Sequence, residues 1–363
     1  MLYFKAGYAI MVLQKGGECM KLSFYTGGYT ATGYAPGHEE RGISYYEWDS
    51  DTDTLQKRIF YGPVNPSWLL LHPNKKVLYC VNETKNGAVQ CYSVTENGVE
   101  KLLCTVDSLG DDPCHLALSP DAKLLAVSNY SSGSIAFYAL QKDGTFGELL
   151  YRHPFSGSGN LQRRQASQHT HSSAFAGGYC YICELGCDGI YRIAVEKILS
   201  GTACASDMEQ VFDFKKDGNV TGIRLGCFTK DEKYYFAGGE LDIRMYGFET
   251  EGMNPICSVE TAPLKEENTF AHIALNADES KVYGSVRGEN KIVCCDVRDG
   301  VLSGLQSYDC GGNCPRYFAL CEPYLIVANQ GSDELVIFEW MTNGSLKERK
   351  RIQETAPTAV VLK

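Results

Sequence analysis

Two histidines in the segment RRQASQHTHSS are the clearest candidates for acid–base chemistry in this chain. His169 and His171 lie two residues apart at the start of an apolar segment, so on a strand their side chains point in opposite directions. We expect one of them to face inward, where an imidazole can act as a general base or as a hydrogen-bond donor. Because the two rings diverge, they are poorly placed to hold one metal ion, and we predict no metal site.

Arginines and glutamates add groups that could stabilise an anion. The guanidinium groups of Arg224, Arg287 and Arg316 could stabilise an oxyanion or hold a carboxylate or a phosphate. Alternatively, they form structural ion pairs with Glu184 or Glu240 between neighbouring sheets. Both interpretations can hold together, because an ion pair would fix the orientation of the guanidinium.

The elements that must position these side chains are β-hairpins. The segment GIRLGCFTKDEKYYFAGGEL predicts a strand at Leu225–Phe228, a tight turn, and a second strand at Tyr234–Ala237. Antiparallel pairing places the start of the first strand and the end of the second at the same end of the hairpin. We therefore expect Arg224 and Glu240 to meet at one edge.

The hairpin recurs along the chain. The repeats restart at Pro66, Pro113, His169, Ile223, Phe270 and Pro315. Intervals of roughly 45–55 residues are typical of propeller blades or kelch-like units, and the N-terminal strands bring the count to seven. We predict an all-β fold, a seven-bladed β-propeller with four-stranded antiparallel blades around a central channel. The last strand, Ala359–Leu362, would pair into the N-terminal blade and close the ring, whereas the alternative double β-sandwich would not repeat its strands in fours.

A propeller would gather residues from distant segments at one end of its channel. The first strand of each blade lies nearest the axis, so residues at its start and just after the second strand crowd the channel mouth. The first set is Ser67, Trp68, Cys114, His115, His171, Ser172, Arg224, Leu225, Ala271, His272, Arg316 and Tyr317. The second set is Asn82, Glu83, Asn129, Tyr130, Glu184, Leu185, Gly239, Glu240, Val286, Arg287, Asn329 and Gln330. Substrate contacts are predicted for His115, Asn129, Glu184, Arg316, Asn329 and, in the loop before His169, Arg164, although solvated polar side chains are also common in propeller channels.

Composition excludes several classes of function. The chain has 363 residues, 21% of them charged, and a net charge of -10, which argues against nucleic-acid binding and means that an anionic substrate would need a local basic pocket. There is no G-x-S-x-G, phosphate-binding or dinucleotide-binding loop motif, so serine hydrolase, NTPase and dinucleotide-enzyme functions lack support. The 16 cysteines lie mostly in apolar segments, which favours reduced, buried thiols in a cytoplasmic protein.

The first residues differ from the repeats. Met1–Cys19 contains a short apolar run, AGYAIMVL, which is too short to span a membrane. We divide the chain into an N-terminal tail of uncertain status at residues 1–19 and one propeller domain at residues 20–363.

At these positions the sequence resembles the propeller lactonase family, whose members include bacterial 6-phosphogluconolactonases and fungal carboxymuconate-lactonising enzymes. The resemblance extends from about Lys21 to the end. It is carried by YTGGYT, PCHLALSPDAKLLAVSNYSSGSIAFY, HTHS followed by CELGCDGI, and CPRYFALCEPYLIVANQGSDELVIF.

The resemblance implies a catalytic set. The family's H-x-H-S histidine, G-P-R-H arginine, hairpin glutamate and S-N-R arginine correspond here to His169 or His171, Arg224, Glu240 and Arg287. Two flanking residues depart from the family pattern, since Leu225 replaces the histidine and Val286 the asparagine. These departures bear on the substrate more than on the type of reaction.

The implied reaction is hydrolysis of a sugar lactone, most directly 6-phosphoglucono-1,5-lactone of the pentose phosphate pathway, without a cofactor. A histidine, with Glu240, would remove a proton from the attacking water, while Arg224 and Arg287 stabilise the oxyanion. Arg163, Arg164 and Arg316 are candidates for binding the phosphate.

Two alternatives stay open. One is a lactonase or cycloisomerase that acts on a non-phosphorylated ring, such as a muconolactone-type compound. The other is a non-catalytic propeller that binds a protein or a glycan through a large apolar patch. The expected partner is a small-molecule lactone, without nucleic acid or membrane, and the expected assembly is a monomer or a weak homo-oligomer.

Overall fold

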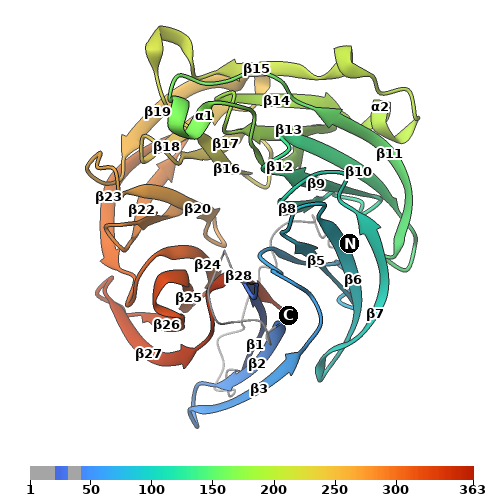
Figure 1. The fold of residues 1–363 in the computed structure, drawn as a ribbon. Coiled ribbons are helices and arrows are strands. Elements are labelled where there is room, and N and C mark those ends of the chain that lie inside the picture. Colours follow the sequence, from blue (N-terminus) through green and yellow to red (C-terminus); the bar gives the residue numbers. More distant parts are fainter. Residues whose placement is uncertain (1–20, 32–41) are drawn as a thin grey trace.

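Seven sheets of four antiparallel strands surround a central axis in the computed structural model, which describes residues 21–31 and 42–363 (Figure 1). The predicted seven-bladed propeller is therefore confirmed. The tail expected at residues 1–19 lies outside the described residues. We call the sheets blades 1–7, and each is given below from its innermost strand outward.

Blade 1 consists of β28 (Pro357–Leu362), β1 (Lys21–Gly28), β2 (Ile43–Asp49) and β3 (Thr54–Phe60); blade 2 of β4 (Leu69–Leu71), β5 (Val77–Asn82), β6 (Ala88–Thr95) and β7 (Gly98–Asp107). Blade 3 consists of β8 (Pro113–Leu118), β9 (Leu124–Asn129), β10 (Ser134–Leu140) and β11 (Phe146–Pro154); blade 4 of β12 (Thr170–Ala176), β13 (Tyr179–Glu184), β14 (Gly189–Ala194) and β15 (Glu209–Asp213). Blade 5 consists of β16 (Ile223–Phe228), β17 (Tyr234–Gly239), β18 (Arg244–Glu249) and β19 (Asn254–Glu260); blade 6 of β20 (Thr269–Leu275), β21 (Lys281–Arg287), β22 (Lys291–Arg298) and β23 (Val301–Asp309). Blade 7 consists of β24 (Pro315–Cys321), β25 (Tyr324–Asn329), β26 (Glu334–Trp340) and β27 (Leu346–Gln353). Two short α-helices lie outside the blades: α1 (Gln162–Gln165) precedes β12, and α2 (Val195–Leu199) follows β14.

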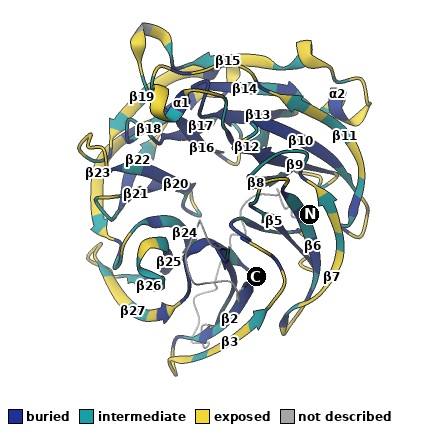
Figure 2. Ribbon diagram, viewed as in Figure 1, coloured by how far each residue is buried: buried dark blue, intermediate teal, exposed yellow. Residues whose placement is uncertain are grey.

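The core lies between adjacent blades. Both faces of a blade pack against neighbours, so the inner strands are apolar along most of their length. Every residue of β9 is buried, whereas no residue of the outermost strand β3 is buried. Figure 2 shows the same gradient from buried inner strands to exposed outer strands. Each fully buried large apolar side chain contributes about 1.5–3 kcal/mol, so this packing holds the innermost strands rigidly around the axis.

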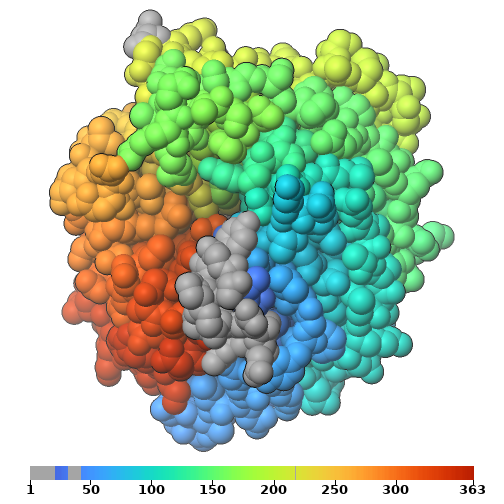
Figure 3. Space-filling view, in the orientation of Figure 1, coloured from blue at the N-terminus to red at the C-terminus, as the bar shows by residue number. Residues whose placement is uncertain are grey.

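The ring closes through the C-terminal strand, as predicted. β28 pairs antiparallel with β1, with Tyr25 opposite Val361, and the hydroxyl of Thr26 donates to the Ala359 carbonyl at 2.8 Å. Side chains of blades 1 and 7, including Trp48 and Ile337, share one apolar cluster. In the space-filling view the blue and red segments from opposite ends of the described chain adjoin each other (Figure 3).

A bulge recurs at the start of the innermost strand of most blades. In β8, Pro113 pairs with Asn129 and His115 with Ser128, which leaves Cys114 without a partner in the ladder. The same offset occurs in β12, β16, β20, β24 and β28, and the residues left out of register there are His171, Arg224, Ala271 with His272, Arg316 and Thr358. Bulges re-aim a side chain away from the regular alternation. Here they present one or two side chains from each of these blades at the axis.

The cysteines and the helices bear on two further predictions from the sequence. The fifteen cysteines of the described residues form no disulfide, and most are buried. No helix in residues 21–31 and 42–363 is long and apolar enough to cross a membrane.

Candidate active site

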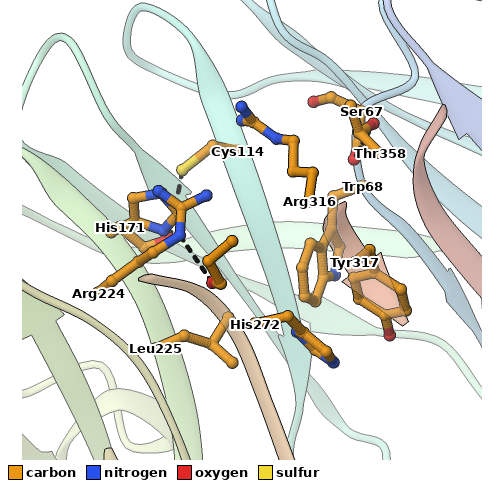
Figure 4. Close-up of a pocket in the computed structure, with 11 residues that line it drawn as sticks. Ser67, Trp68, Cys114, His171, Arg224, Leu225, His272, Arg316, Tyr317 and Thr358 are labelled. Atoms are coloured by element: carbon orange, nitrogen blue, oxygen red, sulfur yellow. Dashed lines mark hydrogen bonds between the residues drawn. The ribbon is translucent and has the colours of Figure 1, made fainter. Parts of the chain in front are cut away.

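A pocket opens at the axis where the bulges converge, and every blade contributes to its wall (Figure 4). The empty space in it, counted together with the open solvent at its mouth, is about 310 Å³. In blade order from 1 to 7, the lining residues are Thr358; Ser67 and Trp68; Cys114; His171; Arg224 and Leu225; Ala271 and His272; Arg316 and Tyr317.

A carboxylate surrounded by guanidinium groups forms one side of the site. Glu240, which is 3% exposed, accepts a hydrogen bond from Arg224 on Oε2. Its Oε1 lies 2.5 Å from Nη2 of Arg164 and 3.3 Å from Nη2 of Arg287. Arg224 also donates from Nε to the Ala271 carbonyl at 2.8 Å. The predicted meeting of Arg224 and Glu240 at one edge of the hairpin is therefore confirmed.

The electrostatics of this cluster are unbalanced. Burial alone would raise the pKa of Glu240, but Arg224, Arg287 and Arg164 outweigh burial and hold its pKa well below the usual value. Burial lowers the pKa of Arg287 to about 10 despite the attraction of Glu240, so this guanidinium is still charged at neutral pH. Three cations share one anion, and the surplus positive charge favours an anionic ligand or an oxyanion.

The backbone of the hairpin brings these groups together. Glu240 N donates to the Gly222 carbonyl at 2.9 Å, just beyond the paired ends of β16 and β17. Gly222 has a φ of 62°, and a Cβ there would lie 2.5 Å from Cγ of Leu241. Only glycine accommodates both constraints, so the approach that places Arg224 beside Glu240 depends on that residue.

The two histidines occupy different environments. His171 is buried and lines the pocket, and its Nδ1 has no hydrogen-bond partner among the described residues. Burial, followed by the charge of Arg224, lowers the pKa of His171 well below its usual value, so the imidazole is neutral. His169 does not line the pocket; its ring stacks on Tyr130 with centroids 4.5 Å apart, and its Nδ1 lies 3.2 Å from the Tyr130 carbonyl. The inward histidine is therefore His171.

A second hydrogen-bonded group lies on another part of the wall. Arg316 donates from Nη2 to the hydroxyl of Tyr29 at 2.8 Å, and Tyr29 donates to Oε1 of Glu83 at 2.8 Å. The other oxygen of Glu83 is hydrogen-bonded to the hydroxyl of Ser67. No carboxylate among the described residues forms a direct ion pair with Arg316, and hydrogen bonds through the Tyr29 hydroxyl link Arg316 to Glu83.

Aromatic side chains complete the pocket. The ring centroid of Trp68 lies 4.2 Å from that of His115 and 5.5 Å from that of Tyr317. Tyr317 stacks on His272, with ring centroids 3.9 Å apart. Trp68 packs against the apolar clusters on both sides of the channel, those of blades 2–3 and of blades 5–6. Burial lowers the pKa of His115 and of His272 to about 3, so both rings are uncharged. Among the lining residues, Arg224 and Arg316 supply the guanidinium groups, and His171 supplies an imidazole whose Nδ1 has no hydrogen-bond partner among the described residues.

Five of the six predicted substrate contacts are not among the residues that line the pocket, namely His115, Asn129, Arg164, Glu184 and Asn329. His115 packs under Trp68, and Glu184 accepts hydrogen bonds from the backbone N–H groups of His169 and Cys187. Asn129 and Asn329, which end β9 and β25, donate to carbonyls of the preceding blade, those of Ser108 at 2.8 Å and Cys310 at 2.9 Å. Their side chains join neighbouring blades, because the end of a second strand lies against the segment entering from the preceding blade. Arg316, by contrast, lies in the pocket wall, and Arg164 reaches Glu240.

Replacing Asn129 with alanine is accordingly expected to reduce stability rather than substrate affinity. The change removes the amide that donates to the buried Ser108 carbonyl. The free energy of unfolding, measured by urea denaturation, should therefore fall by about 1–2 kcal/mol. Substrate KM should stay within about twofold of the wild-type value. The exposed Asn97 provides the control as Asn97→Ala. A raised KM at unchanged stability would contradict this placement.

Some pocket residues were nominated by position without a predicted role, and Thr358 was missed. A sequence signal for it exists, because a proline precedes the pocket residue in Pro66-Ser67, Pro113-Cys114, Pro315-Arg316 and Pro357-Thr358. Glu83 was nominated by its position after the second strand of its blade, but no sequence signal pairs it with Tyr29, which comes from a distant segment.

Comparison with known proteins gives consistent matches. A family model described as Lactonase, 7-bladed beta-propeller matches residues 23–362. A 6-phosphogluconolactonase of Formosa agariphila is 29% identical over 296 residues, covering 76% of this chain and 81% of that protein. A 6-phosphogluconolactonase of Bacillus subtilis is 26% identical over 327 residues, covering 86% and 90%. Among solved structures, the periplasmic gluconolactonase of Pseudomonas aeruginosa has a TM-score of 0.82 at 23% identity, covering 94% of this chain and 99% of that chain; at this identity it bears on the fold alone.

Proposed function

Because the chain belongs to the seven-bladed β-propeller lactonase family, we propose that it hydrolyses a sugar lactone, 6-phosphoglucono-1,5-lactone, to 6-phosphogluconate. The observation that carries the proposal is the neutral imidazole of His171 in the same pocket as the Arg224 guanidinium. Two relatives that match most of this chain are 6-phosphogluconolactonases, which supports lactone hydrolysis as the reaction.

In the proposed mechanism His171 is the general base. A water molecule attacks the lactone carbonyl, and the neutral imidazole takes its proton as the new C–O bond forms. Because the pKa of His171 is lowered, the ring is ready to accept a proton at neutral pH. The family resemblance left His169 and His171 equivalent, and the pocket lining favours His171.

Arg224 stabilises the tetrahedral oxyanion. Its Nε and Nη1 are used on the Ala271 carbonyl and on Glu240, which leaves Nη2 without a hydrogen-bond partner among the described residues. We assign Glu240 to holding Arg224, Arg287 and Arg164 in place rather than to proton removal, because both of its oxygens are already used by these guanidinium groups. Fixed cations cost no reorganisation when the negative charge develops.

The surplus positive charge supports a phosphorylated substrate. On a chain with a net charge of -10, this local excess is what attracts and holds an anion. Arg316 and Arg164 are the candidates for the phosphate. Arg163 is a weaker candidate, because it is exposed and ion-paired with Glu266 outside the pocket lining.

Replacing Arg224 with alanine is expected to lower kcat for 6-phosphogluconolactone by about 10²-fold, because one oxyanion donor is lost. The measurement is the rate of lactone disappearance with purified protein, corrected for spontaneous hydrolysis. Arg298→Ala, which changes an exposed arginine at the end of β22, is the matched control and should retain wild-type turnover. Unchanged kcat in Arg224→Ala would remove this arginine from the mechanism.

A comparison of lactones tests the substrate. Wild-type kcat/KM is expected to be higher for 6-phosphogluconolactone than for glucono-1,5-lactone, since the plain sugar lacks the anion that the arginines would hold. Equal values would instead favour a lactonase of non-phosphorylated rings, and absence of turnover on both lactones would overturn the proposed hydrolysis.

A further inference from the structure

We propose that Ser67 donates the proton that the ring oxygen of the lactone needs when it leaves, and that Glu83 supplies this proton through Ser67. The inference rests on the proposed lactone hydrolysis and extends it to the second half of the reaction. Ring opening releases an alkoxide, which is a strong base, so a positioned acid accelerates that step. His171, once protonated by the attacking water, is an acid on its own side of the pocket, so a ring oxygen that faces Ser67 needs a second donor there.

Ser67 lines the side of the pocket that lies opposite His171 and Arg224. It lines the pocket from blade 2, next to Thr358 of blade 1, whose hydroxyl donates to the Ser67 carbonyl at 2.9 Å. His171 and Arg224 come from blades 4 and 5, across the ring of blades. Figure 4 shows Ser67 and Thr358 on one side of the pocket and His171 and Arg224 on the other. The proposal requires a lactone that lies with its carbonyl facing His171 and Arg224 and its ring oxygen facing Ser67.

The hydrogen bonds behind Ser67 have a fixed direction. A guanidinium can only donate, so Arg316 makes the oxygen of Tyr29 an acceptor, and the Tyr29 hydroxyl donates in turn to Oε1 of Glu83. When Glu83 carries a proton on Oε2, that proton points to Oγ of Ser67, and the serine's own hydrogen is free to point into the pocket. When Glu83 is ionised, the Ser67 hydrogen is used on Glu83 instead. The protonation state of Glu83 therefore decides whether Ser67 can donate to a ligand.

Glu83 holds its proton more tightly in the folded protein than a glutamate in water does, because its pKa is raised. Its side chain is buried, and burial raises the pKa of Glu83 even though Arg316, Ser67 and Tyr29 lower it. The charged and titratable groups that face it are Arg316 on β24, Tyr29 after β1, Asp112 before β8 and Cys114 on β8. Asp112 raises the pKa of Glu83 further.

The proton transfers balance. His171 takes a proton from water as the oxygen of water bonds to the carbonyl carbon. The tetrahedral intermediate then collapses, the bond between this carbon and the ring oxygen breaks, and its electron pair stays on the ring oxygen. The ring oxygen takes the hydroxyl proton of Ser67, while Oγ of Ser67 takes the proton of Glu83. Afterwards solvent reprotonates Glu83 and His171 releases its proton, so the net change is the addition of one water and ionisation of the product acid.

The test uses the full chain with Ser67→Ala, Glu83→Gln and the double variant. Each single change is expected to lower kcat for 6-phosphogluconolactone by about 10²-fold, with KM within about threefold. The double variant should be no slower than Ser67→Ala, because the two groups act as one unit. The exposed residues Ser345 and Glu148 give matched controls as Ser345→Ala and Glu148→Gln.

A pH profile separates this role from a purely structural one. Glu83 must be protonated to act, so wild-type kcat should fall as pH rises through the raised pKa of Glu83, and Glu83→Gln should lose that decline. If Glu83 only balances the charge of Arg316, Glu83→Gln would change KM for the anionic substrate and leave kcat intact, which would overturn the proposal. Multiplying losses in the double variant would overturn it as well.

Two further outcomes are decisive. If Glu83→Gln does not fold, judged by circular dichroism, Ser67→Ala still decides, because wild-type kcat in that variant excludes the serine as donor. Wild-type protein without lactone turnover would overturn the proposed function itself. Normal wild-type turnover with normal Ser67→Ala turnover would overturn only the proton donor.

Discussion

Replacing His171 with asparagine is expected to lower kcat for lactone hydrolysis by about 10²–10⁴-fold, the contribution of a positioned general base. Asparagine preserves polarity and approximate size but accepts no proton at neutral pH. The site itself should persist, because Arg224 is held by Glu240 and by the Ala271 carbonyl rather than by the histidine. Initial rates under saturating lactone, with spontaneous hydrolysis subtracted, measure the effect.

His169→Asn provides the comparison within the same segment. Its ring stacks on Tyr130 and does not line the pocket, so a loss of less than about tenfold is expected. His153→Asn, on the outer strand β11, should match the wild type. A larger loss in His169→Asn than in His171→Asn would reverse the assignment.

The pH dependence has a definite sign. Burial lowers the pKa of His171, so the base form is present above that lowered value and is lost only as pH falls through it. The acidic limb of the kcat profile should therefore lie below about pH 6.5, the ordinary histidine value. A limb above that pH would show that a different group acts as the base.

Replacing Glu240 with glutamine is expected to lower the free energy of unfolding by about 3–5 kcal/mol, because three guanidinium groups lose their shared buried countercharge. Arg224 is 6% exposed, so water cannot replace the carboxylate beside it. Urea denaturation followed by circular dichroism measures the loss. Glu209→Gln removes an exposed partner of Arg192 and should cost at most about 1 kcal/mol.

Acid titration gives an independent check on Glu240. Its folded-state pKa is depressed, so its stabilising contribution is fully present above the unfolded-state value of about 4.3 and is lost as pH falls through the folded-state value. The stability difference between wild type and Glu240→Gln should therefore shrink in acid. A difference that stays constant down to pH 2 would contradict an ion-paired role.

The sequence predicted what local pairing determines. Arg224 and Glu240 flank one hairpin, so antiparallel register alone brings them to the same edge. The repeat period predicted seven blades, and the apolar C-terminal segment predicted ring closure through β28.

The rest depends on contacts that the repeat does not encode. Asn129 and Asn329 occupy repeat positions at the channel mouth, but their amides are used by carbonyls of the preceding blade. A bulge adds one residue to one strand, which leaves no mark on apolar periodicity, so the orientation of Thr358 is indicated only by the proline that precedes it, as in three other blades. Arg316 and Tyr29 are separated by 287 positions in the sequence, and Tyr29 and Glu83 by 54. Only closure of the ring brings these three hydrogen-bonded residues together.

The position of β28 in blade 1 has a consequence for biosynthesis. A ribosome makes β1 early and Pro357–Leu362 near the end of the described chain, so β1 emerges long before its inner neighbour exists. During that interval its inner edge is an unpaired template to which a foreign strand can add. A chain truncated before Pro357 would keep that edge open and would also lack Thr358 from the pocket wall. Closure of the ring and assembly of the pocket therefore depend on the same few residues.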